Sequence, residues 1–311
     1  MFEFLLAFFL LVLFFLVLTI IWRINSRKYI SSGTVASAYD AWTQDKLLER
    51  LWGEHIHLGF YPSGKKNIDF REAKVKFVHE LVKWSGLDKL PKGSRILDVG
   101  CGIGGSSRIL AEYYGFNVTG ITISPAQVKR ARELTPFGLN CSFQVMDALD
   151  LKFEDGSFDA VWSVEAGAHM NDKIKFADEM LRTLRPGGYL ALADWNSRDL
   201  IANPPNLFEK LVLKQLLEQW VHPNFISINE FDNILKTNKN SAGKVISENW
   251  NFYTNPSWYD SIIEGIRRPF AILSLGPFAI IKSIREIPTI ILMNWAFKRG
   301  LMEFGVYKCR G

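Results

Sequence analysis

The sequence predicts an α/β fold in which a mainly parallel, doubly wound sheet lies between layers of helices. Two observations predict this class. Short apolar runs alternate with helical patterns from residue 95 onward, which is typical of strand–helix–strand units. A cluster of glycines follows the first apolar run and precedes a helical pattern, as at the ligand-binding corner of such sheets.

The elements of the sheet region follow one another in a regular order. Strands are expected at residues 96–99, 117–123, 142–146, 158–164 and 189–193. Helices are expected between them, at residues 106–114, 125–133 and 173–184. Pro125 supports the start of the second helix, because the first turn of a helix does not need its missing N–H group.

Helical segments are also expected on both sides of this region. Residues 31–90 contain helical patterns, among them 70–84, and form a predicted N-terminal cap. Residues 206–220 repeat apolar side chains every four residues, which predicts an amphipathic helix. The apolar segment 258–298 is broken by prolines, which argues against a membrane span there. We expect a helical substrate lid around residues 197–300.

The N-terminus has its own signal. Residues 4–22 carry no charge, and as a helix they would extend about 28 Å, close to the thickness of the hydrocarbon layer. Basic residues follow this run and only Glu3 precedes it, which places the remainder of the chain on the cytoplasmic side. A cleaved signal peptide is the alternative, but the basic n-region is missing and the apolar core is too long. Residues 1–30 are therefore expected to form a transmembrane anchor.

Composition excludes several classes of protein. The formal net charge is +5, and no basic run with interleaved aromatic residues indicates a nucleic-acid partner. The three cysteines form no Cys-x-x-Cys pair, which argues against a structural zinc site and against a secreted disulfide framework. We expect no metal, because His55 and His57 lack the further ligands that would complete a site.

The glycine cluster indicates which ligand the sheet binds. Asp98 comes two residues before Gly100, which is followed by Gly102 and Gly104. Glycines let the backbone bend sharply and let a ligand approach closely. Dinucleotide-binding enzymes share this glycine pattern, and a structural turn without a ligand is a further alternative. However, a carboxylate at this point repels a pyrophosphate and attracts an ammonium group. S-adenosylmethionine has an amino group and a sulfonium but no phosphate, so it is the expected cofactor.

Further cofactor contacts are expected at the ends of the next strands. Thr122 stands where an acidic residue often binds ribose, so Thr122 and Gln127 are expected to bind the ribose hydroxyls. The missing acid also weakens the alternative of an NAD-dependent oxidoreductase. Asp147 and Ala148 follow the third strand, where the adenine edge is expected. Ser163, near the end of the fourth strand, completes the predicted cofactor set.

Four residues are candidates for the reaction itself. Glu165 and His169 follow the fourth strand, and ligands bind at the carboxyl ends of parallel strands. His55 and His57 belong to a segment that is expected to cover the cofactor and to present polar groups to the substrate. Carboxylates and imidazoles are the usual general bases, so these residues are the predicted catalytic group.

Taken together, the motifs resemble those of the tocopherol methyltransferase family. The resemblance covers residues 30–311, and the segments that carry it are Trp52–Tyr61, Leu97–Arg108, Gly120–Pro125, Trp162–Glu165 and Arg185–Gly188. It implies a Rossmann-like class I methyltransferase fold over residues 91–311, to which the predicted transmembrane helix and a helical C-terminal cap are added. The anchor and residues 193–196 are most similar to cyanobacterial members, which implies a plasma or thylakoid membrane with the catalytic domain in the cytoplasm.

The resemblance also implies an activity. Family members of this kind methylate a ring carbon of prenylated hydroquinones, namely 2-methyl-6-phytyl-1,4-benzoquinol and its solanyl analogue, in tocopherol and plastoquinone biosynthesis. A base that takes the hydroxyl proton makes the ring more nucleophilic, and no metal is required. A γ-tocopherol methyltransferase is the alternative within the class. A non-catalytic, quinone-binding membrane protein is a further alternative from another class.

Overall fold

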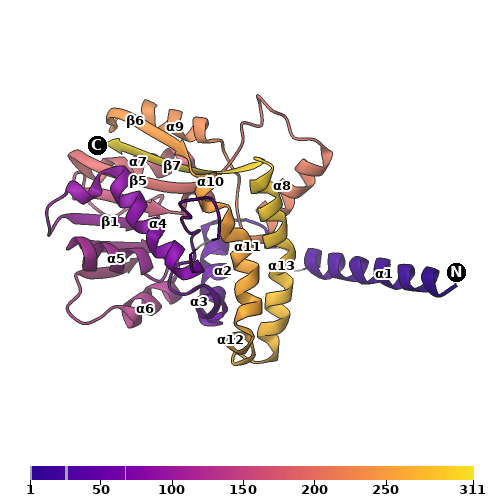
Figure 1. Cartoon of the computed structure of the whole chain (residues 1–311). Coiled ribbons are helices and arrows are strands. Elements are labelled where there is room, and N and C mark those ends of the chain that lie inside the picture. Colours follow the sequence, from indigo (N-terminus) through magenta and orange to yellow (C-terminus); the bar gives the residue numbers. More distant parts are fainter. Residues whose placement is uncertain (1, 25–26, 67) are drawn as a thin grey trace.

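The computed structural model describes residues 2–24, 27–66 and 68–311, and the described residues form one seven-stranded sheet (Figure 1). The strand order is β3-β2-β1-β4-β5-β7-β6. The strands are β1 Arg95–Val99, β2 Asn117–Thr122, β3 Cys141–Val145, β4 Phe158–Val164, β5 Leu184–Ser197, β6 Ala242–Asn249 and β7 Met302–Arg310. The first five strands pair in parallel, whereas β7 runs antiparallel to both β5 and β6. The predicted mainly parallel sheet is confirmed.

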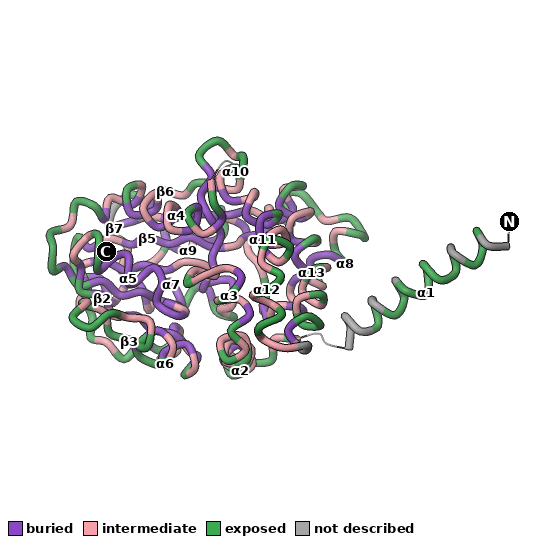
Figure 2. The backbone as a smooth tube through the Cα atoms, turned by 60° about the horizontal axis from the view of Figure 1, so that its bottom comes forward, coloured by how far each residue is buried: buried purple, intermediate pink, exposed green. Residues whose placement is uncertain are grey.

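Helices cover both faces of the sheet because its strands are apolar on both sides. In β1, Ile96 packs into one core with helices α4 (Phe70–Ser85) and α5 (Gly105–Tyr114). Leu97 and Val99 pack into the opposite core with helices α7 (Lys173–Arg182) and α9 (Ile228–Thr237). Helix α6 (Pro125–Leu134) packs on β3 at the edge of the sheet. The chain therefore buries two apolar layers around one sheet (Figure 2).

The segment before the sheet is helical, as the sequence predicts. It contains α2 (Ser32–Gln44), α3 (Leu47–Trp52), α4 and a short 3₁₀ turn, Leu87–Lys89. The side chain of Asp40 in α2 accepts hydrogen bonds from the Ser124 hydroxyl at 2.5 Å and from the Ala126 N–H at 3.0 Å. Both donors lie at the N-terminus of α6, where free N–H groups need an acceptor. Helix α2 is thus fastened across the end of α6.

The segment between β5 and β7 contains helices and one strand, β6, which extends the sheet beyond β7. Its elements are α8 (Leu207–Gln219), α9, β6, α10 (Asn251–Thr254), α11 (Pro256–Arg267), α12 (Pro269–Leu273) and α13 (Pro277–Lys298). The amphipathic helix predicted at 206–220 is confirmed as α8. Three prolines begin α11, α12 and α13, where a missing N–H group is tolerated. The boundaries of a separate lid stay a prediction.

The predicted transmembrane helix is wrong. A helix, α1 (Phe2–Ile24), does form from this segment, and it extends from the body beside α13 (Figure 1). A membrane span needs about 20 consecutive, predominantly apolar residues within one helix. No helix of the described residues is both long enough and apolar enough to meet that requirement. The absence of charge over residues 4–22 is therefore not sufficient evidence for a span.

Candidate active site

A cavity of about 380 Å³ lies at the carboxyl ends of β1, β2 and β4. One part is lined by the glycine turn after β1 and by the loop after β3. The other part is lined by aromatic side chains of the helical segments, and α2 with the loop after α3 covers both. The residues predicted for the cofactor and for catalysis therefore line the same cavity, with the exceptions given below.

The glycine turn fits the amino-acid end of S-adenosylmethionine. Gly100, Gly102 and Gly104 all have positive φ angles, which L side chains rarely adopt. A side chain at Gly100 would collide with Ala166, whereas a Cβ atom at Gly102 would lie 4.0 Å from Gln127 Nε2, without a collision. Gly104 is the residue that precedes α5 and does not itself line the cavity.

Asp98 is the charged group of this turn. It is 2% exposed, and its carboxylate accepts a hydrogen bond from the Ser107 hydroxyl at 2.5 Å. Burial raises the pKa of Asp98 to about 7, and the Ser107 hydrogen bond lowers it by a smaller amount. A buried carboxylate without a cationic partner is costly, and the ammonium group of the cofactor would supply that partner.

The predicted ribose residues contact each other. The Thr122 hydroxyl donates to the side-chain oxygen of Gln127 at 2.7 Å, and both residues are buried and line the cavity. This hydrogen bond leaves the amide nitrogen of Gln127 as the donor available to a ribose oxygen. The Ser163 hydroxyl instead donates to the Val99 backbone carbonyl at 2.8 Å, and Ser163 does not line the cavity.

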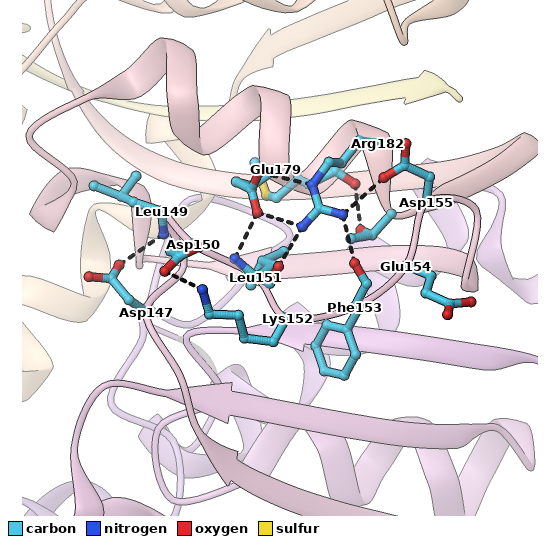
Figure 3. A network of polar contacts seen from close by, with 12 residues as sticks. Asp147, Leu149, Asp150, Leu151, Lys152, Phe153, Glu154, Asp155, Glu179 and Arg182 are labelled. Atoms are coloured by element: carbon cyan, nitrogen blue, oxygen red, sulfur yellow. Dashed lines mark hydrogen bonds and ion pairs between the residues drawn. The ribbon is translucent and has the colours of Figure 1, made fainter.

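The loop after β3 carries Asp147 and Ala148 into the cavity lining. The Asp147 carboxylate accepts from the Leu149 N–H at 2.9 Å, which fixes the turn. Figure 3 shows how Arg182 of α7 holds the rest of this loop. Its guanidinium donates to the carbonyls of Leu151 at 2.6 Å and Phe153 at 2.7 Å, and also pairs with Glu179. The loop is therefore held by α7, which packs on the opposite face of the sheet from α5.

Glu165 is the carboxylate in the part of the cavity next to the cofactor. Its side-chain oxygen accepts the Leu58 N–H at 2.6 Å, which ties it to the covering loop. Burial raises the pKa of Glu165 to about 8, the Leu58 hydrogen bond lowers it, and the nearby Asp194 carboxylate raises it further. Its φ angle is +55°, an unfavourable backbone conformation for a non-glycine residue, and such strain is frequent at functional sites. Glu165 is thus poised to exchange a proton near neutral pH.

His55 and His57 form a hydrogen-bonded chain in the covering loop. His57 Nδ1 lies 2.8 Å from the Leu58 carbonyl, and its Nε2 lies 3.1 Å from His55 Nδ1. With protons assigned to satisfy both contacts, His55 Nε2 is the accepting end of the chain. Burial lowers the pKa of His57 to about 3 and holds that of His55 well below its usual value. No group of three or more potential metal ligands occurs among the described residues.

His169 has both ring nitrogens engaged. Its Nε2 lies 2.8 Å from the Tyr39 hydroxyl, and its Nδ1 lies 3.3 Å from the Val221 carbonyl. Burial lowers its pKa to about 4. Because a neutral imidazole has one donor and one acceptor, these two contacts use both. His169 is therefore better placed to hold Tyr39 and α2 than to take a proton from a substrate.

Several site residues escape the sequence patterns. Tyr39 and Lys74 come from the N-terminal cap, and Lys74 is fully buried with its ammonium 2.7 Å from the His55 carbonyl. Asp194 and Trp195 follow from the length of β5, which extends past the predicted strand. Both residues lie within the segment 193–196, which carries part of the family resemblance, but that segment predicts no role for either of them. Only contacts between segments far apart in sequence reveal these residues.

This fold, with a buried acid beside the glycine turn, is that of an S-adenosylmethionine-dependent methyltransferase. A family model described as a methyltransferase domain matches residues 97–192. The 2-methyl-6-phytyl-1,4-hydroquinone methyltransferase of Synechocystis sp. is 54% identical over 93% of this chain and 91% of its own. The chloroplastic tocopherol O-methyltransferase of Arabidopsis thaliana is 36% identical over 85% and 78%. The chain belongs to the tocopherol methyltransferase family, which includes both relatives.

Solved structures show the same fold. A mycolic acid cyclopropane synthase has a TM-score of 0.76 at 16% identity, covering 91% of this chain and 99% of that one. A geranyl diphosphate methyltransferase has a TM-score of 0.66 at 20% identity, covering 90% and 98%. The predicted Rossmann-like methyltransferase fold is thus confirmed, whereas the transmembrane helix predicted with it is wrong. S-adenosylmethionine is the cofactor.

Proposed function

We propose that this enzyme methylates a ring carbon of 2-methyl-6-phytyl-1,4-benzoquinol and of its solanyl analogue. The observation that carries the proposal is Glu165, a carboxylate with a pKa raised to about 8, inside an aromatic cavity that adjoins the cofactor site. The 54% identity to an enzyme named for the phytyl substrate supports the same substrate class.

Glu165 supplies the base in this proposal. Its ionised carboxylate takes the proton of a ring hydroxyl, which increases electron density on the neighbouring ring carbon. Bound S-adenosylmethionine supplies an electrophilic methyl group, and a carbon–carbon bond forms as the carbon–sulfur bond breaks. The methylated carbon then loses its own proton, the hydroxyl is restored, and one proton is released overall. Asp98 and the glycine turn hold the donor, while aromatic walls exclude water and align the ring.

The direct test uses purified enzyme, labelled S-adenosylmethionine and a panel of acceptors. The panel contains the phytyl and solanyl hydroquinones, the matching oxidised quinones, and γ-tocopherol. Label in the two hydroquinones and none in the quinones is expected, because only the reduced ring has a proton to give up. Preferred labelling of γ-tocopherol would instead support the alternative activity that the Arabidopsis relative suggests.

We also propose that the enzyme works at a membrane surface, from its cytoplasmic side. Large apolar side chains are exposed on α8, α12 and α13, at the end of the molecule from which α1 extends (Figure 1 and Figure 2). They include Leu207, Phe208, Phe270, Leu273, Ile281 and Ile284. Exposed patches of this kind mark interaction sites, and a prenyl tail resides in a bilayer. The three free cysteines are consistent with a reducing compartment.

Vesicle binding tests the surface proposal. The double substitution Phe270→Ser and Leu273→Ser is expected to weaken sedimentation with anionic lipid vesicles, because it removes two exposed apolar groups from α12. The matched control is Phe137→Ser, at an exposed position distant from these helices. Equal vesicle binding by all three proteins would exclude α12 as a contact.

A further inference from the structure

His222 follows α8 and carries the least satisfied polar side chain in the cavity. It is 3% exposed, it lines the cavity, and neither ring nitrogen has a hydrogen-bond partner among the described residues. The Ala168 carbonyl is near enough to raise the pKa of His222, but it forms no hydrogen bond of normal geometry with either ring nitrogen. A buried polar group left without a partner is destabilising, and most buried polar groups in proteins have one.

The backbone in front of His222 is strained. Val221 has a φ angle of +59°, which is an outlier for a β-branched residue and is unfavourable. The His222 N–H donates to the Leu217 carbonyl at 3.0 Å, which closes the turn at the end of α8. The strained turn directs His222 into the cavity, and Val221 also supplies the carbonyl contacted by His169.

His222 stacks on His169, and of these two rings only His222 has nitrogens that are available to a ligand. Its ring stacks on His169 at a centroid distance of 4.2 Å and an interplanar angle of 22°. His169 uses both nitrogens on Tyr39 and Val221, so His222 is the member of the pair that remains available. The ring of Trp195 lies 5.4 Å from that of His222. Its buried indole N–H makes no hydrogen bond of normal geometry, but it is near enough to Glu165 to lower the pKa of that carboxyl. The indole N–H of Trp258, whose ring lies 5.3 Å from that of Trp195, is also buried without a hydrogen bond of normal geometry.

These unsatisfied groups fit an oxygen-bearing aromatic ring. A hydroquinone has two hydroxyls at opposite ends of its ring, and each can donate and accept a hydrogen bond. Glu165 can take only one of them. His222 comes from the turn after α8 and, as a neutral imidazole, offers both a donor and an acceptor. The rings of His169, Trp195 and Phe225 lie next to it and suit the flat face of the substrate.

We propose that His222 is a substrate-binding residue that receives the second ring hydroxyl of the hydroquinone, the one that Glu165 does not take. This inference rests on the proposed function and assigns to His222 the selection of a hydroquinone over a ring with one hydroxyl. Trp195 and Trp258 form the walls that hold the ring between Glu165 and His222.

The test combines substitutions of His222 with substrates that lack one hydroxyl hydrogen. The substrates are 2-methyl-6-phytyl-1,4-benzoquinol and its two mono-O-methyl ethers. In the wild type, we expect kcat/KM to fall at least tenfold for one ether because its oxygen can no longer donate a hydrogen bond to His222. We expect a larger fall for the other ether because Glu165 has no proton to take. His222→Phe keeps the stacking on His169, and we expect it to lose about tenfold on the hydroquinone and to become insensitive to the first ether.

His222→Gln, which keeps a donor and an acceptor, should recover most of the activity and of the sensitivity to the ether. Phe225→Leu is the matched control, since Phe225 contacts the same ring at 5.0 Å but is apolar, and it should show the wild-type ether pattern. Tryptophan fluorescence should report weaker hydroquinone binding to His222→Phe loaded with S-adenosylhomocysteine, while affinity for that cofactor product stays unchanged.

The outcomes separate the two hypotheses. If the wild type methylates no hydroquinone, the proposed function is wrong. If it does, but His222→Phe shows the same ether ratios as the wild type, only the role of His222 is wrong. If His222→Phe does not fold, His222→Gln and the wild-type ether ratios decide the question. A wild type that methylates one ether as fast as the hydroquinone needs no second hydroxyl contact, and that result overturns the inference.

Discussion

At the scale of single residues, the chemistry depends on two buried carboxylates, one that binds the cofactor and one that acts as the base. Asp98 has to be ionised to hold a cation, and Glu165 has to be ionised to accept a proton. Burial raises the pKa of both, to about 7 and about 8. Their protonation near neutral pH therefore controls cofactor binding and turnover separately.

Asp98 should make cofactor binding dependent on pH. Since the ionised carboxylate pairs with the ammonium group, affinity for S-adenosylmethionine should be constant above pH 7 and weaken by about tenfold per unit below it. Asp98→Asn should weaken binding by about 1.5–3 kcal/mol and remove this dependence. Calorimetry between pH 5.5 and 8 measures both effects. The exposed Asp88→Asn is the control, and an unchanged pH profile in Asp98→Asn would contradict the assignment.

Glu165 should control the methyl-transfer rate. The rate should rise with pH and level off above about 8, because only the ionised carboxylate accepts a proton. Glu165→Gln should lower kcat by about 10²–10⁴ while leaving cofactor affinity unchanged. Single-turnover rates measure this loss, with Glu112→Gln on the surface of α5 as the control. Near-normal turnover of Glu165→Gln would remove Glu165 from the mechanism.

The positions of Asp98, Gly100 and Gly102 beside the cavity could be predicted because these residues follow one another within a single turn, and their contacts with the cofactor stay a prediction. The roles of Tyr39, Lys74 and His222 could not, since each depends on partners from distant segments. His169 lies in the cavity as predicted, but its two hydrogen bonds are invisible in a sequence pattern. Whether His169, His55 and His57 take part in catalysis stays a prediction.

At the scale of elements, α2 is held over the cofactor site mainly by polar contacts. Among its described side chains only Val35 is buried, and Asp40 supplies the two hydrogen bonds to the N-terminus of α6. Asp40→Ala should therefore loosen α2 with little effect on the melting temperature of the body. Faster hydrogen exchange over residues 32–44 and about tenfold weaker cofactor binding are expected, whereas Ser37→Ala on the same helix should change neither.

The central strands were predictable because each is a short apolar run between turns, and Phe158–Val164 has the predicted bounds. Strands β6 and β7 and helix α9 were not predicted. They lie in or after a segment interpreted as a lid, and β7 pairs antiparallel with β5 across more than one hundred residues of chain. Long-range pairing of this kind leaves no local spacing to detect.

At the scale of the whole molecule, α1 is separate from the chemistry. Its described side chains include many exposed apolar groups, whereas the cavity lining begins at Arg27. Deleting residues 1–24 should therefore leave affinity for S-adenosylmethionine within about twofold and reduce sedimentation with lipid vesicles. Calorimetry and vesicle sedimentation measure the two properties. Loss of cofactor binding with an intact circular dichroism spectrum would show that α1 supports the site.

The size of the cavity has a consequence for the range of substrates. About 380 Å³ is near the lower end of the range for ligand sites, and this space has to admit both the aromatic head and the methyl donor. A long isoprenoid chain has no room there and has to trail outside. Discrimination by chain length is then weak, since the protein measures only the head. One enzyme is expected to serve acceptors with short and long tails alike, at rates set by how readily each tail leaves its surroundings.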